Sequence, residues 1–385
     1  MWINLLVIMS TIALGFHYMR YEKIFYKIDS FGNTHNRTLG GARKNYIKII
    51  SLILILQSGL RNFAVGADKY QYSLIFDQVK SLSWQEIFNS VKAYYTFGEG
   101  KDPGYLVFQK TFQYLSHDYQ VYLIFVAIVF FSALGFFLYK NTRRVSDVLF
   151  AFVLYSTLFY AMFSITGIRQ TLATAAALWG YELIKRKKLL SFLLLILLAS
   201  TIHKSVLIFT PLYFIRSPRA VKYLLVSFAM FLPLMFAYSD SISVFFQSMD
   251  DTYAAYEHME NLKPYNYVIL NLLIFLMGLM TYKASQKQAI YPDTRFWYAA
   301  LLLATFFTTQ VFAIHGFMRV IYYFSIFNLL LIPHMITLLS SKWKLSHSQL
   351  TTWAIIILLV LYISGTSDSE YKFFWQIMEL GENYR

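Results

Sequence analysis

The sequence predicts an all-α membrane protein, and its composition and its long apolar runs both lead to that fold class. Of its 385 residues, 57% are hydrophobic and only 14% are charged, which is more apolar surface than one soluble core can bury. Apolar runs that approach the ~20 residues of a spanning helix recur along the chain. We therefore expect a polytopic membrane protein with about 12 transmembrane helices in one integral domain, residues 1–385.

The expected spans follow one another from the first residues onward. Residues 2–16 lack the basic leading segment and the small-residue cleavage site of a secretory signal, so we expect the first span to be retained. The expected spans are residues 1–19, 46–64, 119–139, 146–164, 168–184, 189–202, 205–215, 221–238, 265–282, 296–314, 319–339 and 350–365.

The loops between these spans alternate in charge. Basic clusters near residues 20–48, 140–144, 185–188, 216–222, 283–295 and 342–344 fall in every second loop. Cytoplasmic loops carry such an excess of Lys and Arg, so both termini and the long loops 62–118 and 239–265 are expected outside the cytoplasm. This orientation explains the net charge of +14 without nucleic acid, which we do not expect as a partner.

The segment 189–215 is too short to cross a membrane twice. It holds enough residues for two half-length helices at about 1.5 Å per residue, and we expect a short, re-entrant-like pair. Its turn, at His203 and Lys204, would then stop inside the membrane. A single long helix would also place His203 near mid-depth, but it would reverse every later loop and break the alternation of charge.

The outer loop 62–118 contains a predicted interfacial helix near residues 83–96. Ser83-Trp-Gln-Glu86 forms a capping box, the pattern that starts a helix. One side of this helix is expected to be apolar and aromatic, and to lie in the membrane interface. That side would carry Trp84, Ile87, Phe88, Val91, Tyr94 and Tyr95.

Three arginines, Arg61, Arg169 and Arg319, stand at the outer ends of expected spans. A guanidinium is a planar fork of donors that stays charged and suits a phosphate or diphosphate. The alternative is that each arginine snorkels to a lipid phosphate. Arg169 favours a site, because small residues on the same helix face would let a neighbouring helix approach and hold it rigidly. These small residues are Ala173, Ala176, Ala177 and Gly180.

Other polar residues in apolar surroundings extend this candidate site. His203 and Lys204 lie where charge is costly, which favours a functional cavity over a simple packing histidine. His315 and Arg319 are four residues apart and share a helix face. The outer carboxylates that could act as a general base are Asp68, Glu99, Asp102 and Glu257.

Metal and cofactor signals are poor. The chain has no cysteine, no His-Glu-x-x-His motif, no glycine-rich phosphate loop and no Gly-x-Ser-x-Gly elbow. Asp250 and Asp251 are adjacent carboxylates in a polar loop, which are usually solvated. We expect neither a metal nor a cofactor.

Several short motifs, taken in order, resemble the EpsG/Wzy-type polysaccharide polymerases of bacteria. The likeness runs from the second expected span to the eleventh. The motifs are Gly59-Leu-Arg-Asn-Phe-Ala-Val-Gly-Ala-Asp68 with Tyr72, Asp102-Pro-Gly-Tyr105, Gly167-Ile-Arg-Gln170 with Ala173, Ile202-His-Lys-Ser205, and Arg319 with Tyr322 and Tyr323.

The resemblance implies a GT-C-like membrane glycosyltransferase in the bacterial cytoplasmic (inner) membrane, with its active site facing the periplasm or exterior. Its donor would be an oligosaccharide repeat on undecaprenyl diphosphate, and its acceptor a lipid-linked repeat or growing chain. The product would be O-antigen of lipopolysaccharide or an exopolysaccharide. Membrane lipids surround such an enzyme, and a chain-length regulator is a further partner that the likeness admits.

The resemblance also suggests roles for individual residues. Arg169, Arg61 and Arg319 would stabilise the diphosphate leaving group. His203 would either bind the diphosphate or assist the acceptor hydroxyl, and Asp68, with Glu257 as second choice, would deprotonate that hydroxyl. Further substrate contacts are expected from His315, Lys204, Gln170, Tyr72 and Tyr322. Trp84, Tyr94 and Tyr95 could stack on sugar rings, although membrane-belt aromatics are equally expected there.

Three rival functions stay open. A polysaccharide O-acyltransferase also uses a buried histidine and outer arginines, and His315-Gly-Phe-Met-Arg319 suits it superficially. A flippase for lipid-linked oligosaccharides would need basic residues along both leaflets, whereas these arginines stand at one end of the spans. An O-antigen ligase uses the same donor as a polymerase and differs only in its acceptor.

Overall fold

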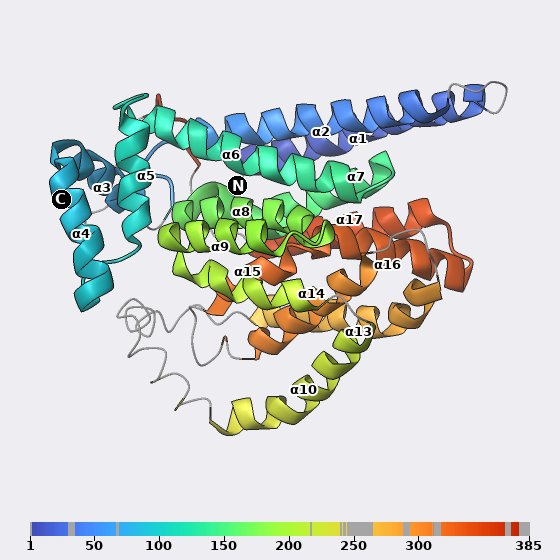
Figure 1. Cartoon of the computed structure of the whole chain (residues 1–385). Coiled ribbons are helices and arrows are strands. Elements are labelled where there is room, and N and C mark those ends of the chain that lie inside the picture. The colour runs from blue at the N-terminus through green and yellow to red at the C-terminus, as the bar shows by residue number, and fades with distance from the viewer. Residues whose placement is uncertain are drawn as a thin grey trace. The chain divides into compact units, whose positions relative to one another are not determined.

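The computed structural model describes residues 2–29, 35–66, 69–215, 218–238, 241, 244, 265–287, 293–309, 311, 317–365 and 371–376. In these ranges the chain is helical apart from turns and one isolated antiparallel β-bridge between Arg61 and Phe373, so the all-α fold class is confirmed (Figure 1). The helices before the first π-helical turn are α1 (Trp2–Asp29), α2 (His35–Gly59), α3 (Lys69–Ser81), α4 (Trp84–Phe97), α5 (Pro103–Gln113), α6 (Tyr119–Asn141) and α7 (Val145–Leu154). The rest are the π-helical turns η1 (Tyr155–Phe159) and η2 (Ala161–Thr166), then α8 (Ile168–Lys185), α9 (Leu189–Ile202), the 3-10 helix η3 (Lys204–Phe214), α10 (Pro218–Ala237), α13 (Tyr265–Lys287), α14 (Thr294–Thr308), α15 (Phe317–Ser325), α16 (Asn328–Trp343) and α17 (His347–Gly365).

Several helices are long and apolar enough to cross a membrane. Four in the described ranges meet that requirement, and the bent pair α15 and α16, with an angle of 51° between them, makes a fifth if it is one span. The four are residues 2–22, 119–141, 267–286 and 347–364. The expectation of a helical membrane protein agrees with these helices, whereas the count of about 12 spans stays a prediction.

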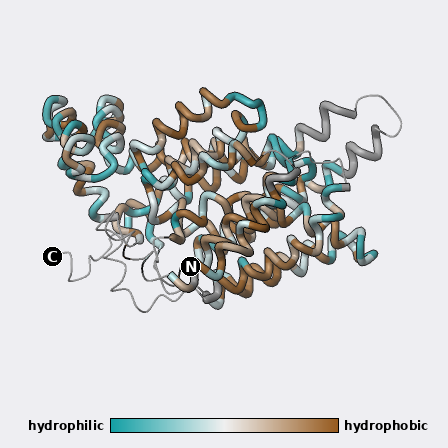
Figure 2. The backbone as a smooth tube through the Cα atoms, turned by 60° about the horizontal axis from the view of Figure 1, so that its bottom comes forward, coloured by the Kyte–Doolittle hydropathy of each residue, from teal (hydrophilic) through white to brown (hydrophobic). Residues whose placement is uncertain are grey.

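The chain divides into two compact units, Met1–Leu207 with Trp353–Arg385, and Ile208–Thr352. In the first unit α1 and α2 run side by side, and α2, α6, α8 and α9 contact one another in that order (Figure 1). Apolar residues dominate these long helices, whereas the group α3 to α5 at one end is more hydrophilic (Figure 2). That end carries the residues of the candidate site.

Two glycines bring α2 and α6 into close contact. A Cβ on Gly59 would lie 3.0 Å from the Cα of Ile124, and one on Gly135 would lie 2.9 Å from the Oγ of Ser51. Helix α6 has an almost even distribution of apolar residues and is buried on several sides, as expected of a helix inside a bundle. The end of α2, and the arginine that follows it, are therefore fixed against α6.

A helix with the expected capping box is present as α4, whereas its place in a membrane interface stays a prediction. The backbone N–H of Ser83 donates to Glu86 Oε2 over 2.6 Å, while the Ser83 hydroxyl accepts from the Glu86 N–H, which completes the capping box. Its expected apolar side is divided, because Ile87 is buried whereas Phe88 and Tyr95 are exposed. The outer loop 62–118 also contains α3 and α5, so it is a small helical group.

Other expected spans differ from the structure at their ends. Helix α2 ends at Gly59 and not at residue 64, so Arg61 follows the helix as part of the β-bridge. The expected span 319–339 is two helices, because at Phe327 the hydrogen bond tightens to Phe324 O, 3.2 Å away, and the chain bends. The end of α9 at Ile202 agrees with the expected break before His203.

The second unit is built around α14, which contacts α10, α13, α15 and α16. Trp297 of α14 is buried at its centre. Asn271 donates to Thr308 over 2.6 Å, so a side-chain hydrogen bond also joins α13 to α14. Most of the second outer loop, 239–265, lies outside the described residues.

Candidate functional site

The site is centred on an ion pair between Arg169, in the first turn of α8, and Asp102, the residue before α5. Arg169 Nη1 lies 2.7 Å from Asp102 Oδ2. The arginine side chain is 19% exposed and the aspartate side chain 4%. A salt bridge this far from water is costly to break, because either partner alone would be a buried charge.

The backbone around Asp102 is strained in a way that fits a functional loop. Asp102 has φ 46° and ψ 61°, which lie in the left-handed region that residues other than glycine rarely adopt. Pro103 follows at the first helical position, where its missing N–H has no cost. Gly104 allows α5 to touch α9, since a Cβ there would lie 2.0 Å from the Oγ1 of Thr201. Asp102 is thus held against the end of α9.

His203 stands at that end of α9. Its backbone is extended, with φ −154° and ψ 106°, and its N–H still donates to Ala199 O over 3.0 Å. The Nδ1 atom lies 3.7 Å from Asp102 Oδ2, longer than a hydrogen bond but within reach of a charge interaction. One carboxylate oxygen therefore faces both Arg169 and His203.

Asp102 is held in its ionised form. Burial acts to raise the pKa of Asp102, but interaction with His203 and the positive charge of Arg169 outweigh burial and keep that pKa below its ordinary value. A general base works best when its pKa lies near the operating pH. Asp102 is for this reason suited to orienting its two neighbours rather than to accepting a proton itself.

Two tyrosines line the other side of the Arg169 guanidinium. Arg169 Nε donates to Tyr72 Oη over 3.4 Å, and the guanidinium carbon lies 5.6 Å and 5.8 Å from the ring centres of Tyr72 and Tyr105. Cations are attracted to aromatic faces at such distances. Behind these rings lies a buried apolar cluster that includes Phe76 and Tyr122. The arginine is consequently fixed in position before any ligand binds.

Lys204 lies beside the same region. Its ammonium is 5.7 Å from the ring centre of Tyr94, on α4. Gln170, next to Arg169, is 2% exposed and so is not a surface residue. The small residues after Arg169 act as expected: a Cβ on Gly180 would lie 3.3 Å from Phe192 of α9, and Ala173 is buried.

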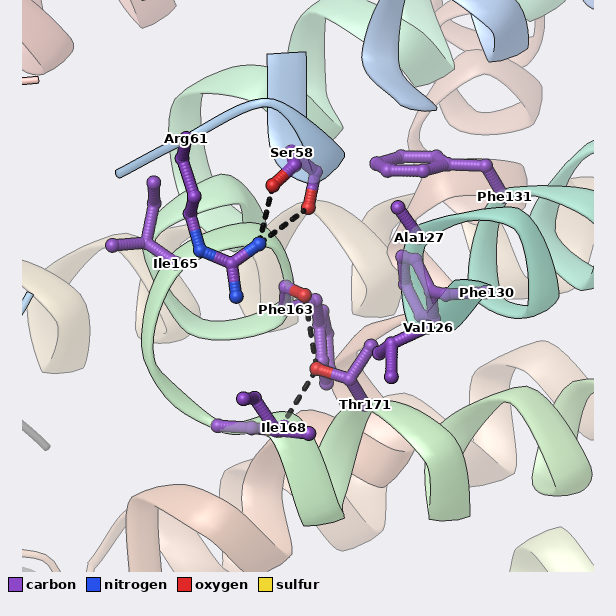
Figure 3. A pocket seen from close by; sticks show the side chains of 11 residues that line it. Ser58, Arg61, Val126, Ala127, Phe130, Phe131, Phe163, Ile165, Ile168 and Thr171 are labelled. Atoms are coloured by element: carbon purple, nitrogen blue, oxygen red, sulfur yellow. Dashed lines mark hydrogen bonds between the residues drawn. The ribbon is translucent and has the colours of Figure 1, made fainter. Parts of the chain in front are cut away.

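Arg61 has a different environment, a small pocket between α2, α6 and the start of α8. Its Nη1 donates to the carbonyl and hydroxyl oxygens of Ser58, the latter 3.3 Å away. Figure 3 shows this guanidinium beside Ser58, with Phe163 and Thr171 across the pocket. The pocket wall is mostly apolar, and only Ser58, Arg61 and Thr171 contribute polar side chains to it.

The remaining expected site residues fall into two groups. Arg319 and Tyr322, both on α15, belong to the second unit and are half-buried. Asp68, His315 and Glu257 lie outside the described residues, so their roles stay predictions. Among the described residues, no group of three His, Asp or Glu could hold a metal ion.

The structure gives Asp102 an importance that sequence reasoning did not. From the sequence, Asp102 is one of four carboxylates that could act as a general base, and Asp68 and Glu257 are preferred to it. The signal that could have singled it out is Asp102-Pro103-Gly104, where a rigid residue and a glycine follow a carboxylate directly. That pattern fits a sharp helix start with close backbone contact, which positions a side chain firmly.

Fold and site together define a helical membrane protein in which a partly exposed arginine meets a buried carboxylate and a buried histidine at one end of its first unit. Comparison with known families matches residues 44–376 to the EpsG family, and the chain belongs to that family. Searches of curated proteins and of solved structures found no match. The family match covers Arg61 and Arg169, the β-bridge at Arg61 and the whole second unit.

Proposed function

We propose that the protein is a polysaccharide polymerase, a glycosyltransferase that joins lipid-linked oligosaccharide repeats. Membership of the EpsG family supports a role in polysaccharide synthesis. The observation that carries the proposal is the buried contact of Arg169, Asp102 and His203, which brings a phosphate-binding cation and a proton acceptor together.

In the proposed reaction a hydroxyl oxygen of the acceptor attacks the anomeric carbon of the donor sugar. The bond between that carbon and the diphosphate oxygen breaks, and the diphosphate leaves with its lipid and the bonding electron pair. The hydroxyl proton passes to a general base. Negative charge therefore accumulates on the leaving oxygen, while the attacking oxygen needs to lose its proton.

Arg169 is the group proposed to receive the leaving diphosphate. Its contact with Asp102 and the two tyrosine rings fixes it, so little reorganisation is needed when charge develops. The partial exposure of Arg169 leaves part of the guanidinium open to a ligand. Lys204, Gln170 and Tyr72 are proposed as further contacts to phosphate or sugar.

His203 is proposed as the general base, with Asp102 as its positioning residue. The Nδ1 atom of His203 faces the carboxylate, an arrangement that favours a proton on Nδ1 and leaves Nε2 to accept one. Asp102 also stabilises the imidazolium that forms. Asp68 is the rival base and stays a prediction, as do the contributions of Arg61, Arg319, His315 and Tyr322 to substrate binding.

The cellular setting proposed here is the bacterial inner membrane, with the site on the periplasmic or exterior face. The capped helix α4, with its exposed aromatic side chains, is suited to a membrane interface. About 12 spans in a GT-C-like arrangement and undecaprenyl diphosphate as the lipid carrier belong to the same proposal.

Reconstitution tests this function directly. The purified full chain in lipid nanodiscs should convert a chemically defined lipid-diphosphate-linked repeat into a ladder of longer glycans, without added metal. The Arg169→Ala variant should produce no such ladder of longer glycans. A wild-type protein that binds the repeat but leaves it unextended under all acceptor conditions would contradict the proposal.

A further inference from the structure

Arg61 is a buried cation for which the described residues supply no compensating anion. It is 3% exposed, and no carboxylate within the described ranges forms an ion pair with it. Its Nη1 has the two oxygens of Ser58, whereas its Nε has no hydrogen-bond partner among the described atoms. Burial of an unpaired charge costs several kcal/mol, which is a large fraction of the free energy of unfolding of a typical protein. Something other than the described residues is expected to compensate this charge.

Two buried tyrosine hydroxyls lie near Arg61 in addition to Ser58. Tyr119 and Tyr160 lie within electrostatic reach of the guanidinium, and in the described part of the chain their buried hydroxyls have no hydrogen-bond partner. Tyr160 stands between the π-helical turns η1 and η2, an irregularity that often marks a functional site. A guanidinium with nearby hydroxyl donors matches the oxygens of a phosphate group.

The pocket is closed to such a ligand in this structure. Its cavity of about 10 Å³ has room for one water molecule and none for a phosphate. Residues 371–376, which we name the C-terminal strap, lie beside Arg61 without lining the pocket itself, and Tyr371 of the strap is within electrostatic reach of both Arg61 and Tyr160. The strap forms the β-bridge at Phe373 directly opposite Arg61.

The strap is attached to the chain around Arg61 by two backbone hydrogen bonds and by two that use side chains, one of them from the Tyr371 hydroxyl to the carbonyl of Gln57. The N–H of Asn62 donates to Lys372 O over 2.8 Å, and the N–H of Phe374 donates to Leu60 O over 2.9 Å. The Asn62 side chain also donates to the carbonyl of Gln376 over 2.7 Å. Such a short, two-residue pairing is marginal by itself, so it can open without unfolding the helices beneath it.

We propose that Arg61 is a phosphate- or diphosphate-binding site and that the C-terminal strap is its gate. Detachment of the strap opens the side of Arg61 that faces Tyr160 and Tyr371, and a bound anion then compensates the buried charge. The proposal rests on the proposed function in one respect, namely that the anion is the diphosphate of a lipid-linked substrate. Arg61 and Arg169 would then contact substrate on different sides of the first turn of α8, whose residues Gly167 and Ile168 line the Arg61 pocket.

A disulfide lock on the full-length chain tests the gate. The natural protein has no cysteine, so Leu60→Cys with Phe374→Cys introduces the only pair of thiols. These two residues face each other across the β-bridge, and their side chains make none of the hydrogen bonds that attach the strap. The probe is inorganic diphosphate, and the readout is the rise in melting temperature that a ligand of the folded state produces.

The expected result is a diphosphate-dependent rise in melting temperature for the reduced double variant and loss of its Arg61-dependent part on oxidation. That part is the difference between the reduced double variant and the same variant carrying Arg61→Ala. Arg61→Lys should retain some of it, which guards against a folding defect in the alanine variant. Single-cysteine variants treated with oxidant should behave as the untreated protein does.

Equal diphosphate stabilisation in the oxidised and reduced forms would overturn the gate, and an unchanged response in Arg61→Ala would overturn the site. These failures differ from failure of the proposed function. If the locked protein polymerises at the full rate, the proposed function holds and the gate is contradicted. If diphosphate stabilises the protein in a strap-dependent way but the protein extends no glycan, the gate holds and the proposed function is contradicted.

Discussion

Helix α8 carries an ion pair near each end, and the two pairs are built differently. At one end Lys185 Nζ lies 2.6 Å from Glu182 of the same helix, and Asn141 of α6 bonds to both. At the other end Arg169 pairs with Asp102, which comes from a separate strained loop. Both cationic side chains are 19% exposed, so exposure does not separate them.

The difference lies in what each pair needs from the rest of the fold. The Lys185 pair is local and hydrogen-bonded on all sides, as expected for a helix end in a basic loop. The Arg169 pair needs α5, α8 and α9 in position, costs backbone strain, and has a histidine beside it. Strain maintained by surrounding structure is typical of functional sites. Variants at the two ends are therefore natural controls for each other.

The largest effect is expected from Arg169→Ala. Loss of the guanidinium removes the group that stabilises the leaving diphosphate, worth about 10²- to 10³-fold in rate, and leaves Asp102 buried without its partner. Glycan in cells should collapse from long chains to single repeats, with the protein still inserted at the normal level. Arg169→Lys should rescue poorly, because it loses the planar fork. Full-length chains from the alanine variant would refute the role of Arg169.

His203→Gln should reduce the rate by about 10²-fold, the lower range for loss of a general base. The more informative readout is the pH profile. A base that must lose its proton to act gives the pH profile an acid limb, and this limb should disappear in the variant. A rate that falls but retains the same limb would assign the proton transfer to another group.

Asp102→Asn should cost less, about 10-fold, because asparagine retains the shape and some hydrogen bonding but loses the charge. The pKa of Asp102 lies below the ordinary aspartate value of about 3.9, so its ionised contribution is present above that pH and is lost as pH falls through the lowered pKa. Between pH 5 and 8 the wild-type carboxylate should stay charged. A wild-type activity loss that follows Asp102 protonation in that range, seen by infrared difference spectra, would contradict this assignment.

Lys185→Met should have the smallest effect. Methionine retains most of the side-chain length, and Asn141 still donates to the Glu182 carboxylate, so the cost falls on the stability of the fold rather than on the reaction. Glycan length and rate should stay within about 2-fold of the wild type. If this variant were as defective as Arg169→Ala, the contrast between the two ends of α8 would be lost, since both defects would then reflect general damage.

Local features of this fold could be predicted from the sequence because they depend on neighbouring residues. The capping box at Ser83 gave α4, and the apolar run ending before His203 gave α9. Gly180, which follows Arg169 on the same helix, indicated close contact with another helix, and that helix is α9. Such signals act within a few turns and need no knowledge of the tertiary structure.

The site partners could not be predicted in this way. Asp102 and Arg169 are 67 residues apart, and no periodicity in the sequence relates them. Arg61 was expected at the outer end of a spanning helix, but α2 stops at Gly59, and Arg61 lies beyond it in a separate pocket. The strap joins residues 314 positions apart through backbone groups, which leave no pattern in the side chains.

A double-mutant cycle on Asp102 and His203 tests the central claim most directly, because it asks whether the two residues act as one unit. The measurement is the rate of glycan extension by reconstituted wild type, Asp102→Asn, His203→Gln and the double variant. If Asp102 acts by orienting His203, the double variant should be no slower than His203→Gln alone. Losses that multiply, to about 10³-fold, would show independent roles and contradict the account.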